Sequence, residues 1–354
     1  MAPRLLCMFG AAALLPGAPL ASPGTCAAAD LDGCPPITDA AGEEGGPDGA
    51  ALLQVSRLQD AELAPHAVEA GGDWKFPQMT IATWNLACFE KAKPSEIAAT
   101  LAQLEVDVIG TQEDIEFNET SQDSALSIPG YTKVVACRGE ALWDSEPAYA
   151  WGGRWLQNAI YIRDETVTWE RSFTKNISNP EVVGDYLRCA AVADLRKNGC
   201  KRDLPVRVAS VHLTGGRFVD SNFLSYNGEK GHEIREALAV RPDVLMGDFN
   251  SYNSKEQVEQ FQQSYSPYTD AKENGQLNQY LGWTLEGTQE AARAGYVRID
   301  NSENTTTYGG TVDHIYLRPE VGLKARSFRV LGGNLVGDFE QSDHNLAATG
   351  LIAY

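Results

Sequence analysis

The sequence has few basic residues and no long hydrophobic run, and each shortage excludes a class of protein. Only 29 Lys and Arg stand against 48 Asp and Glu among the 354 residues, which leaves a net charge of −19. Such a balance argues against high-affinity, sequence-independent coating of DNA. No stretch approaches the roughly 18 consecutive apolar residues of a membrane-spanning helix, which argues against a multispan membrane protein. Cys/His spacings typical of zinc sites and repeats typical of solenoids or propellers are also missing.

The rest of the composition is that of a folded protein. Hydrophobic residues make up 43% of the chain, which is ordinary for a packed core, and the length suits one large domain or two small ones. Much of the acidic excess lies in residues 30–75, where ten acids stand against Arg57 and Lys75 in a Gly-, Ala- and Pro-rich segment. We expect 30–75 to be a flexible acidic leader or propeptide, and 76–354 to be the folded domain.

Residues 1–29 have the pattern of a secretory signal peptide. Arg4 gives a basic start, an apolar middle follows, and small residues lead to an A-x-A cleavage option after Ala29, with another near Ala21. An N-terminal helix of the domain is the alternative, which Pro16 and Pro19 disfavour because they interrupt the helical run. The pattern predicts a secreted protein.

The chain has seven cysteines, and secretion would permit disulfides. Cys189 and Cys200 flank a predicted turn between two strand-like runs, so we expect them to pair. The alternative is that both are unpaired thiols.

Short strands punctuated by turns, with a few amphipathic helices, predict an α+β fold in which helices cover the sheets. The predicted helices begin at Pro94 and occupy about 230–239 and 254–263. The predicted strands cover residues 79–86, 106–113, 134–137, 159–162, 187–195, 206–212, 244–246, 314–317 and 345–352.

Polar and ionisable residues stand at the ends of these strands, where they could meet at one rim of the domain. They are Asn85, Glu113, His212, Asp248, Asn250, Asp313, Asp343 and His344. Singly, such residues are often turn formers, helix caps or core histidines. The set as a whole favours a catalytic site.

Three of these residues offer hard oxygen ligands. Glu113, with Asn85 and Asp343, suits Mg²⁺, or Mn²⁺ or Ca²⁺ in its place. A cation of this kind neutralises charge on a scissile phosphate and orients it. The sequence therefore predicts a divalent-metal site beside Glu113.

The other strand-end residues suit hydrolysis of a phosphoester. His344, hydrogen-bonded to Asp313, would accept a proton from water. His212 would lie across the phosphate as a donor to the leaving oxygen, while Asp248 and Asn250 would orient the water and the phosphate. Alternation within the strand puts His314 on the face opposite Asp313, so we interpret it as structural.

Six segments, in this order, resemble the endonuclease/exonuclease/phosphatase superfamily, whose founding fold is that of deoxyribonuclease I. The resemblance implies a four-layered αββα sandwich, in which two mostly antiparallel sheets pack face to face with helices outside, and it makes 76–354 the catalytic domain. It also implies the same roles for the strand-end residues. The segments are TWN (83–85), TQE (111–113), SVH (210–212), MGDFN (246–250), TVDHI (311–315) and SDH (342–344).

Two further residues are candidates for binding phosphate. Asn158, in QNAIYI, resembles a strand start whose amide binds phosphate in several branches of the family. The TGG after His212 resembles the TGG after the corresponding histidine in the catalytic subunits of cytolethal distending toxin. Arg217 follows it and could clamp an oxygen. The alternative for 214–217 is a flexible hairpin tip. Together with Arg138 and Arg154, Arg217 could also make one edge attractive to phosphate despite the acidic body.

The resemblance leaves several substrate classes open. The Trp-Cys-Asp-Arg stretch of inositol 5-phosphatases is missing before YGGTVDHI, and His212 distinguishes the chain from abasic-site endonucleases. We expect a monomeric endonuclease of deoxyribonuclease I type, with nucleic acid favoured over lipid. The alternatives are a sphingomyelinase-like or inositol-phosphate phosphoesterase and, more remotely, an inactive binding module. Aromatic residues in 143–155 could stack bases, insert at a lipid surface or, as we favour, pack beneath the sheet edge.

Overall fold

The structure is a computed structural model that describes residues 79–117, 126–141, 153–184, 187–199, 204–215, 220–299, 304–306, 310–331, 342 and 344–353. The predicted signal peptide and leader lie outside these residues, so both stay predictions. Within the described part of the chain, no helix combines the length and the apolar character needed to cross a bilayer.

The first sheet has six strands in the order β11-β12-β1-β2-β4-β3. In it, β1 and β2 are parallel, and the other neighbours are antiparallel. Side chains alternate between its faces, so that Ile81 enters the core between the sheets while Trp84 lies on the outer face. The strands are β1 (Met79–Asn85), β2 (Val108–Phe117), β3 (Tyr131–Ala141), β4 (Gly153–Arg163), β11 (Leu323–Leu331) and β12 (Leu346–Ala353).

The second sheet also has six strands, in the order β5-β6-β7-β8-β10-β9. Here β7 and β8 form the parallel pair, and the other neighbours are antiparallel. Each sheet is therefore mostly antiparallel. The strands are β5 (Val167–Asn176), β6 (Cys189–Lys197), β7 (Val206–His212), β8 (Val244–Asp248), β9 (Val297–Arg298) and β10 (Asp313–Leu317).

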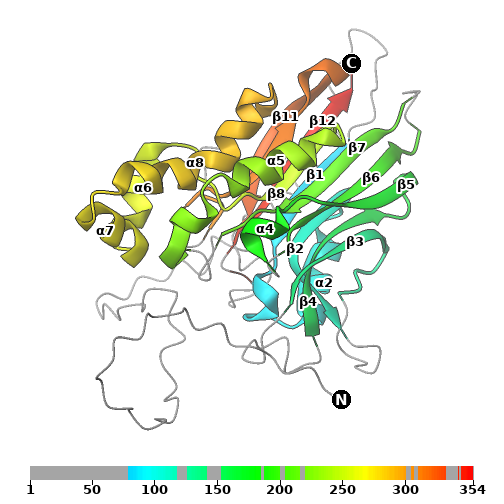
Figure 1. Ribbon diagram of the computed structural model, residues 1–354. Helices are drawn as coiled ribbons and strands as arrows, with labels where there is room; N and C mark the ends of the chain where they lie inside the picture. The colour runs from blue at the N-terminus through cyan, green and yellow to red at the C-terminus, as the bar shows by residue number, and fades with distance from the viewer. Residues whose placement is uncertain are drawn as a thin grey trace, which may run out of the picture. The chain divides into compact units, whose positions relative to one another are not determined.

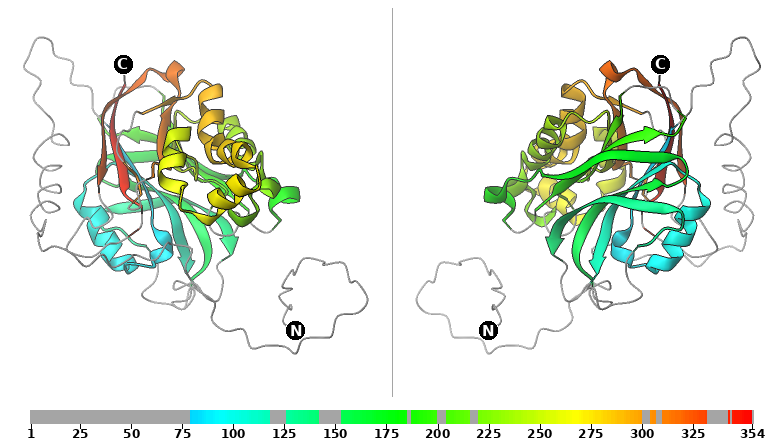
Figure 2. Two further views of the ribbon diagram at one scale, coloured as in Figure 1. Left: turned by 90° about the vertical axis from the view of Figure 1, so that its left-hand side faces the viewer. Right: turned by 90° about the vertical axis from the view of Figure 1, so that its right-hand side faces the viewer.

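Helices cover the outer faces of the two sheets, as the two views of Figure 2 show. On the first sheet, α2 (Pro94–Gln103) buries Ile97 and Leu101 against the strands. On the second, α5 (Glu229–Ala239) and α8 (Leu277–Arg293) bury Ile234 and Ala291 (Figure 1). A third apolar cluster, which includes Ile160, fills the space between the sheets. The predicted four-layered αββα sandwich is confirmed.

Shorter helices complete the described part of the chain. They are η1 (Ala87–Phe89), α4 (Pro180–Val183), η2 (Asp220–Tyr226), α6 (Lys255–Gln262), α7 (Ser266–Glu273) and η3 (Pro319–Val321). The N-cap of α6 is Ser254, whose side chain accepts a hydrogen bond from the Gln257 amide. The helices predicted at 94, 230–239 and 254–263 correspond to α2, α5 and α6.

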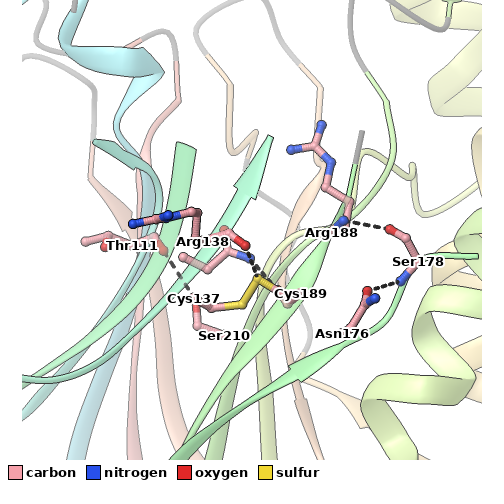
Figure 3. The surroundings of a disulfide bond; sticks show 9 residues. Thr111, Cys137, Arg138, Asn176, Ser178, Arg188, Cys189 and Ser210 are labelled. Atoms are coloured by element: carbon pink, nitrogen blue, oxygen red, sulfur yellow. Dashed lines mark hydrogen bonds between the residues drawn. A yellow bond between two sulfur atoms is a disulfide. The ribbon is translucent and has the colours of Figure 1, made fainter. Parts of the chain in front are cut away.

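One disulfide is present in the described residues, and it is not the predicted one. Cys137 of β3 and Cys189 of β6 are bonded across the two sheets, with 6.1 Å between their Cα atoms (Figure 3). The predicted Cys189–Cys200 pair is wrong because Cys189 is bonded to Cys137. Cys200 lies outside the described residues, and Cys189 begins β6 instead of flanking a turn. Eight steps of about 3.3 Å place the far end of that strand roughly 26 Å away, whereas a disulfide needs Cα atoms within about 7 Å.

Loss of this crosslink is expected to destabilise the protein. The bond closes a loop with a sequence separation of 52, so Cys137→Ser is expected to lower the free energy of unfolding by about 2–4 kcal/mol. Urea denaturation of the wild type and the variant, each with and without dithiothreitol, measures the effect. Reductant should destabilise the wild type alone. A mass-spectrometric map linking Cys189 to Cys200 would contradict the pairing.

Candidate active site

Strand direction brings the predicted residues to one edge of the sandwich. Because β7 and β8 are parallel, they end together, and His212 pairs with Asp248. Because β10 runs antiparallel to β8, it starts where β8 ends, and Asp313 also pairs with Asp248. In the other sheet β1 and β2 are parallel, so Asn85 lies opposite Gln112, next to Glu113. The strand ends of both sheets therefore converge.

Asn85 joins the two sheets at this edge. Its Nδ2 donates to Glu113 Oε1 at 3.2 Å and to Asp248 Oδ2 at 3.0 Å, while its Oδ1 accepts from the Ala87 amide at 2.9 Å. Asn85 thus turns its amide nitrogen toward the carboxylates. In this orientation Asn85 positions Glu113 and Asp248. Its role as a metal ligand stays a prediction.

Glu113 occupies an irregular position in β2. The register between β2 and β4 shifts between Thr111 and Asp114, and Glu113 has a φ of 52°, in the left-handed region. A β-bulge of this kind re-aims a side chain at a sheet edge. The Cys88 Sγ donates to Glu113 Oε2 at 3.0 Å, so both carboxylate oxygens of Glu113 have a partner.

The backbone around Asp248 requires a glycine. Gly247 has a φ of 142°, and a Cβ there would lie 1.9 Å from the Val211 carbonyl oxygen of the neighbouring strand. Asn250 follows with a φ of 44°, and its amide donates to Asp248 Oδ1 at 2.7 Å. The GDFN segment is therefore a tight strand exit that aims Asp248 and Asn250 at the site.

His344 and Asp313 form the predicted pair. The His344 Nδ1 lies 2.9 Å from Asp313 Oδ2, and the two backbone contacts of His344 hold its position: its carbonyl accepts from Trp84 Nε1 at 2.8 Å, and its amide donates to Ser342 Oγ at 3.0 Å. Burial raises the pKa of Asp313, an effect that the neighbouring His344 opposes. The carboxylate accepts the Nδ1 proton, which leaves Nε2 as the basic nitrogen.

His212 has a different environment from His344. Its Nδ1 lies 3.2 Å from an Arg188 guanidinium nitrogen, and because arginine can only donate, Nδ1 accepts and the proton is on Nε2. Burial, with Arg188 and His344 nearby, holds the pKa of His212 well below its ordinary value. His212 is therefore a neutral imidazole whose N–H points toward Asp248, at 3.5 Å, and Glu113, at 3.8 Å.

Arg188 is the site residue that sequence reasoning missed. It directly precedes β6, and the pairing of Ala191 with Ser210 brings the start of β6 to the end of β7, beside His212. Arg188 is buried, with 7% of the residue exposed, and Figure 3 shows its side chain beside the disulfide. Arg188 lies inside the strand predicted over 187–195, so its position at a strand end could not have identified it. The signal that could have found it is an arginine within a mostly apolar strand.

A small pocket adjoins His212 on this side. Asn158 lines it and donates from Nδ2 to the Cys189 carbonyl at 2.7 Å. The structure thus places Asn158 beside the site with one amide hydrogen held by backbone. The lining residues are Cys137, Gly139, Leu156, Asn158, Arg188, Cys189 and His212.

The remaining sequence predictions concern His314, the arginines and Asp343. His314 is structural as predicted, because its Nε2 lies 2.8 Å from the Ser251 carbonyl and burial lowers its pKa to about 3. Arg138 pairs with Glu116 at 2.6 Å on the surface. The arginine cluster stays a prediction, because the side chain of Arg154 lies outside the described part of the chain. Asp343 and Arg217 lie outside the described residues.

The donor set fits a hard divalent cation. Three carboxylates converge here, with side-chain exposures of 22% for Glu113, 2% for Asp248 and 0% for Asp313. Ligand atoms of Asp248, Asp313 and His344 lie within 4.8 Å of one another, and Asp313 Oδ1 is buried without a hydrogen-bond partner among the described residues. Oxygen-rich, partly buried clusters of this kind favour Mg²⁺-like ions because a cation relieves the repulsion between carboxylates.

Known structures share this fold. One is an endonuclease/exonuclease/phosphatase from Beutenbergia cavernae DSM 12333, at 16% identity, with 78% of this chain and 72% of that chain covered and a TM-score of 0.53. Another is a functionally unknown conserved protein from Enterococcus faecalis V583, at 14% identity, with 78% and 100% covered and a TM-score of 0.50. No curated protein matches the chain.

The chain also matches a family model over a range that includes the described site residues. The model of the Endonuclease/Exonuclease/phosphatase family matches residues 82–344, which run from β1 to the catalytic histidine predicted at the last strand. Members of this family are phosphoesterases and nucleases. The match spans most of the chain, so the chain belongs to the Endonuclease/Exonuclease/phosphatase family.

Proposed function

We propose that this protein is a secreted, Mg²⁺-dependent phosphodiesterase that hydrolyses its substrate by in-line attack of water, most specifically an endonuclease. The observation that carries the proposal is the pair of unlike histidines around Asp248. His344 Nε2 lies 3.9 Å from Asp248 Oδ2, and His212 Nε2 lies 3.5 Å from the same oxygen. One imidazole can accept a proton while the other donates a hydrogen bond.

The base in this mechanism is His344. Asp313 holds its Nδ1 proton at 2.9 Å, so Nε2 accepts a proton from the attacking water. Asp248 lies within reach of the same water and orients it. Asp313 is fully buried, so water does not compete for its carboxylate. The carboxylate therefore stabilises the imidazolium that forms when His344 accepts the proton.

On the opposite side, His212 stabilises the phosphate. A neutral imidazole with a lowered pKa is a poor proton source, so His212 donates a hydrogen bond from Nε2 to a phosphate or leaving oxygen. This refines the sequence prediction, in which His212 was a donor to the leaving group. Arg188 fixes the tautomer of His212 from behind, and Asn250 lies beside Asp248 to hold the phosphate in line.

The residues that would hold Mg²⁺ are Glu113 and Asp248, with Asn85 orienting both. When bound, the ion supplies charge neutralisation for the phosphate oxygens. Asp343, which we predicted as a further ligand, remains a prediction.

Glu113→Gln is expected to weaken the apparent affinity for Mg²⁺ by about 10–100-fold, because it removes a charged oxygen ligand. The measurement is the hydrolysis rate against Mg²⁺ concentration after EDTA treatment. Glu116→Gln, three residues along the same strand and paired with Arg138, is the matched control. Full activity in EDTA, or equal Mg²⁺ titrations for both variants, would contradict the metal site.

The substrate is tested by one panel of assays on plasmid DNA, RNA, sphingomyelin and inositol phosphates. The missing inositol 5-phosphatase stretch and the TGG after His212 support nucleic acid. We expect Mg²⁺-dependent cleavage of nucleic acid. Cleavage of sphingomyelin alone would overturn this choice, and no cleavage of any substrate would favour a binding module.

Secretion is the remaining part of the proposal. It is supported by the signal-like segment at 1–29 and by the Cys137–Cys189 disulfide, since such bonds persist in oxidising compartments. N-terminal sequencing of the protein recovered from culture medium should give a start after Ala29. Retention inside the cell with an intact N-terminus would refute it.

A further inference from the structure

The helix α5 buries three ionisable side chains that the proposed mechanism does not use, Glu229, Lys230 and Glu233, and the last two contact the segments that follow β8 and β7. Glu233 is 0% exposed and Lys230 is 1% exposed. Charged groups are rarely buried to this extent unless they are paired or hydrogen-bonded. Both lie behind the loops that leave β7 and β8, so their partners are informative.

Glu233 holds the segment that follows His212. Its Oε2 accepts from the Thr214 amide at 2.7 Å, and its Oε1 accepts from the Thr214 hydroxyl at 2.5 Å and from the Ser178 hydroxyl at 3.0 Å. Three donors on one carboxylate satisfy a buried charge. The Ser178 hydroxyl in turn accepts from the Arg188 amide at 2.7 Å, so Glu233 is connected to both sides of His212.

Lys230 holds the segment that follows Asp248. Its Nζ donates to the Asn250 carbonyl oxygen and lies 3.7 Å from the ring centre of Trp283 in α8. Asn250 has a φ of 44°, a conformation that few residues other than glycine adopt. The lysine contact therefore stabilises the backbone conformation of Asn250.

The two segments also pack against each other. Asn250 Nδ2 donates to the Leu213 carbonyl at 3.1 Å. A Cβ on Gly215 would lie 2.4 Å from the Asn250 Cβ, so the chain after His212 passes directly over Asn250. A displacement of Thr214 would therefore move Asn250 as well as His212.

We propose that Glu233 and Lys230 are positioning residues that set the β7 and β8 exit loops and thereby align His212 and Asn250 for catalysis. This inference rests on the proposed function, because it assigns a role to the same site. Neither residue contacts the reacting atoms. Their effect is transmitted through the backbone of Thr214 and Asn250.

The charge on Glu233 makes the alignment of His212 and Asn250 depend on pH. Burial raises the pKa of Glu233 to about 7, opposed by hydrogen bonds from Thr214 and by Arg188, and reinforced by Glu229. Below that pKa the carboxyl is protonated and holds Thr214 less strongly, because charge-assisted hydrogen bonds are about twice as strong as neutral ones. Catalysis is therefore expected to improve as pH rises through about 7.

The test compares Glu233→Gln with Glu236→Gln on the same helix. Glu236 is 37% exposed and pairs with Lys175 at 2.8 Å, so it is the matched control. Glu233→Gln is expected to lower kcat by about tenfold with KM little changed, and to remove the rise in kcat through about pH 7. Glu236→Gln should keep the wild-type kcat and pH profile.

A second variant tests the positioning role of Glu233 even if Glu233→Gln does not fold. Thr214→Val keeps the side-chain shape and removes a hydroxyl that lowers the pKa of Glu233, so the rise in kcat should move to higher pH. An unmoved profile in Thr214→Val, or a Glu233→Gln enzyme indistinguishable from Glu236→Gln, would overturn the inference. Failure of the proposed function differs, because the wild type would then hydrolyse no phosphoester at any pH.

Discussion

Replacing His344 by alanine is expected to lower kcat by about 10³–10⁴-fold and to leave the protein folded. General base catalysis contributes up to about 10⁴-fold, and here the base is an imidazole held by Asp313 at 2.9 Å. Because KM reports mainly contacts with the substrate, we expect it to change little. Steady-state kinetics on the best substrate of the panel gives both constants.

The control for this variant is His232→Ala. His232 is a half-buried residue of α5 for which we predict no catalytic role, so its kcat should match that of the wild type. Circular dichroism and thermal melting check that each protein is folded. Undiminished hydrolysis in folded His344→Ala would refute the assignment of the base.

Replacing Asp248 by alanine is expected to abolish hydrolysis, with a loss of at least about 10³-fold. The carboxylate contacts Asn85 at 3.0 Å, the Asn250 amide at 2.7 Å and His212 at 3.5 Å. Its removal therefore releases groups from both sheets at once. Asp248→Asn keeps the shape without the charge and should be nearly as inactive.

Stability should respond to Asp248→Asn differently from activity. Asp248 raises the pKa of the neighbouring Asp313 by repulsion, so loss of the charge relieves a like-charge contact and should not lower the melting temperature. Asp270→Ala, at an exposed position of α7, is the control for both readouts. An active Asp248→Ala enzyme, or a strongly destabilised Asp248→Asn, would contradict this role.

Strand alternation and strand ends were sufficient to predict most of the site. Asp313 and His314 are adjacent, yet alternation correctly assigned one to the catalytic edge and the other to the core, where it packs against Phe249. The parallel pairing of β7 with β8 brings His212 and Asp248 together, as the sequence pattern predicted.

The edge strand β5 and the long helix α8 were missed, each for its own reason. β5 is an edge strand whose residues after Val167 are exposed or half-buried, so it lacks the alternation of a half-buried strand. α8 contains Gly282 and Gly287, which lower helix propensity. Gly287 is nevertheless suited to its place, because a Cβ there would lie 2.9 Å from Leu213 Cδ1.

Contacts across the two sheets could not be predicted from local patterns. The Cys137–Cys189 bond joins strands 52 positions apart, and Arg188 reaches His212 only because β6 runs antiparallel to β7. Both depend on how the strands pair and pack. A single sequence shows strand ends, but not which strand beginnings meet them.

We propose that residues from both sheets act as one catalytic unit that hydrolyses a phosphoester. The most direct test measures kcat with Mg²⁺ for the wild type, His344→Ala, Asp248→Ala and the double variant on one substrate. Because residues that act as a unit are non-additive, the account predicts that the wild type is active and that the double variant retains about the residual rate of the slower single variant. An inactive wild type, or a double variant slowed by the product of the two single losses, would contradict it.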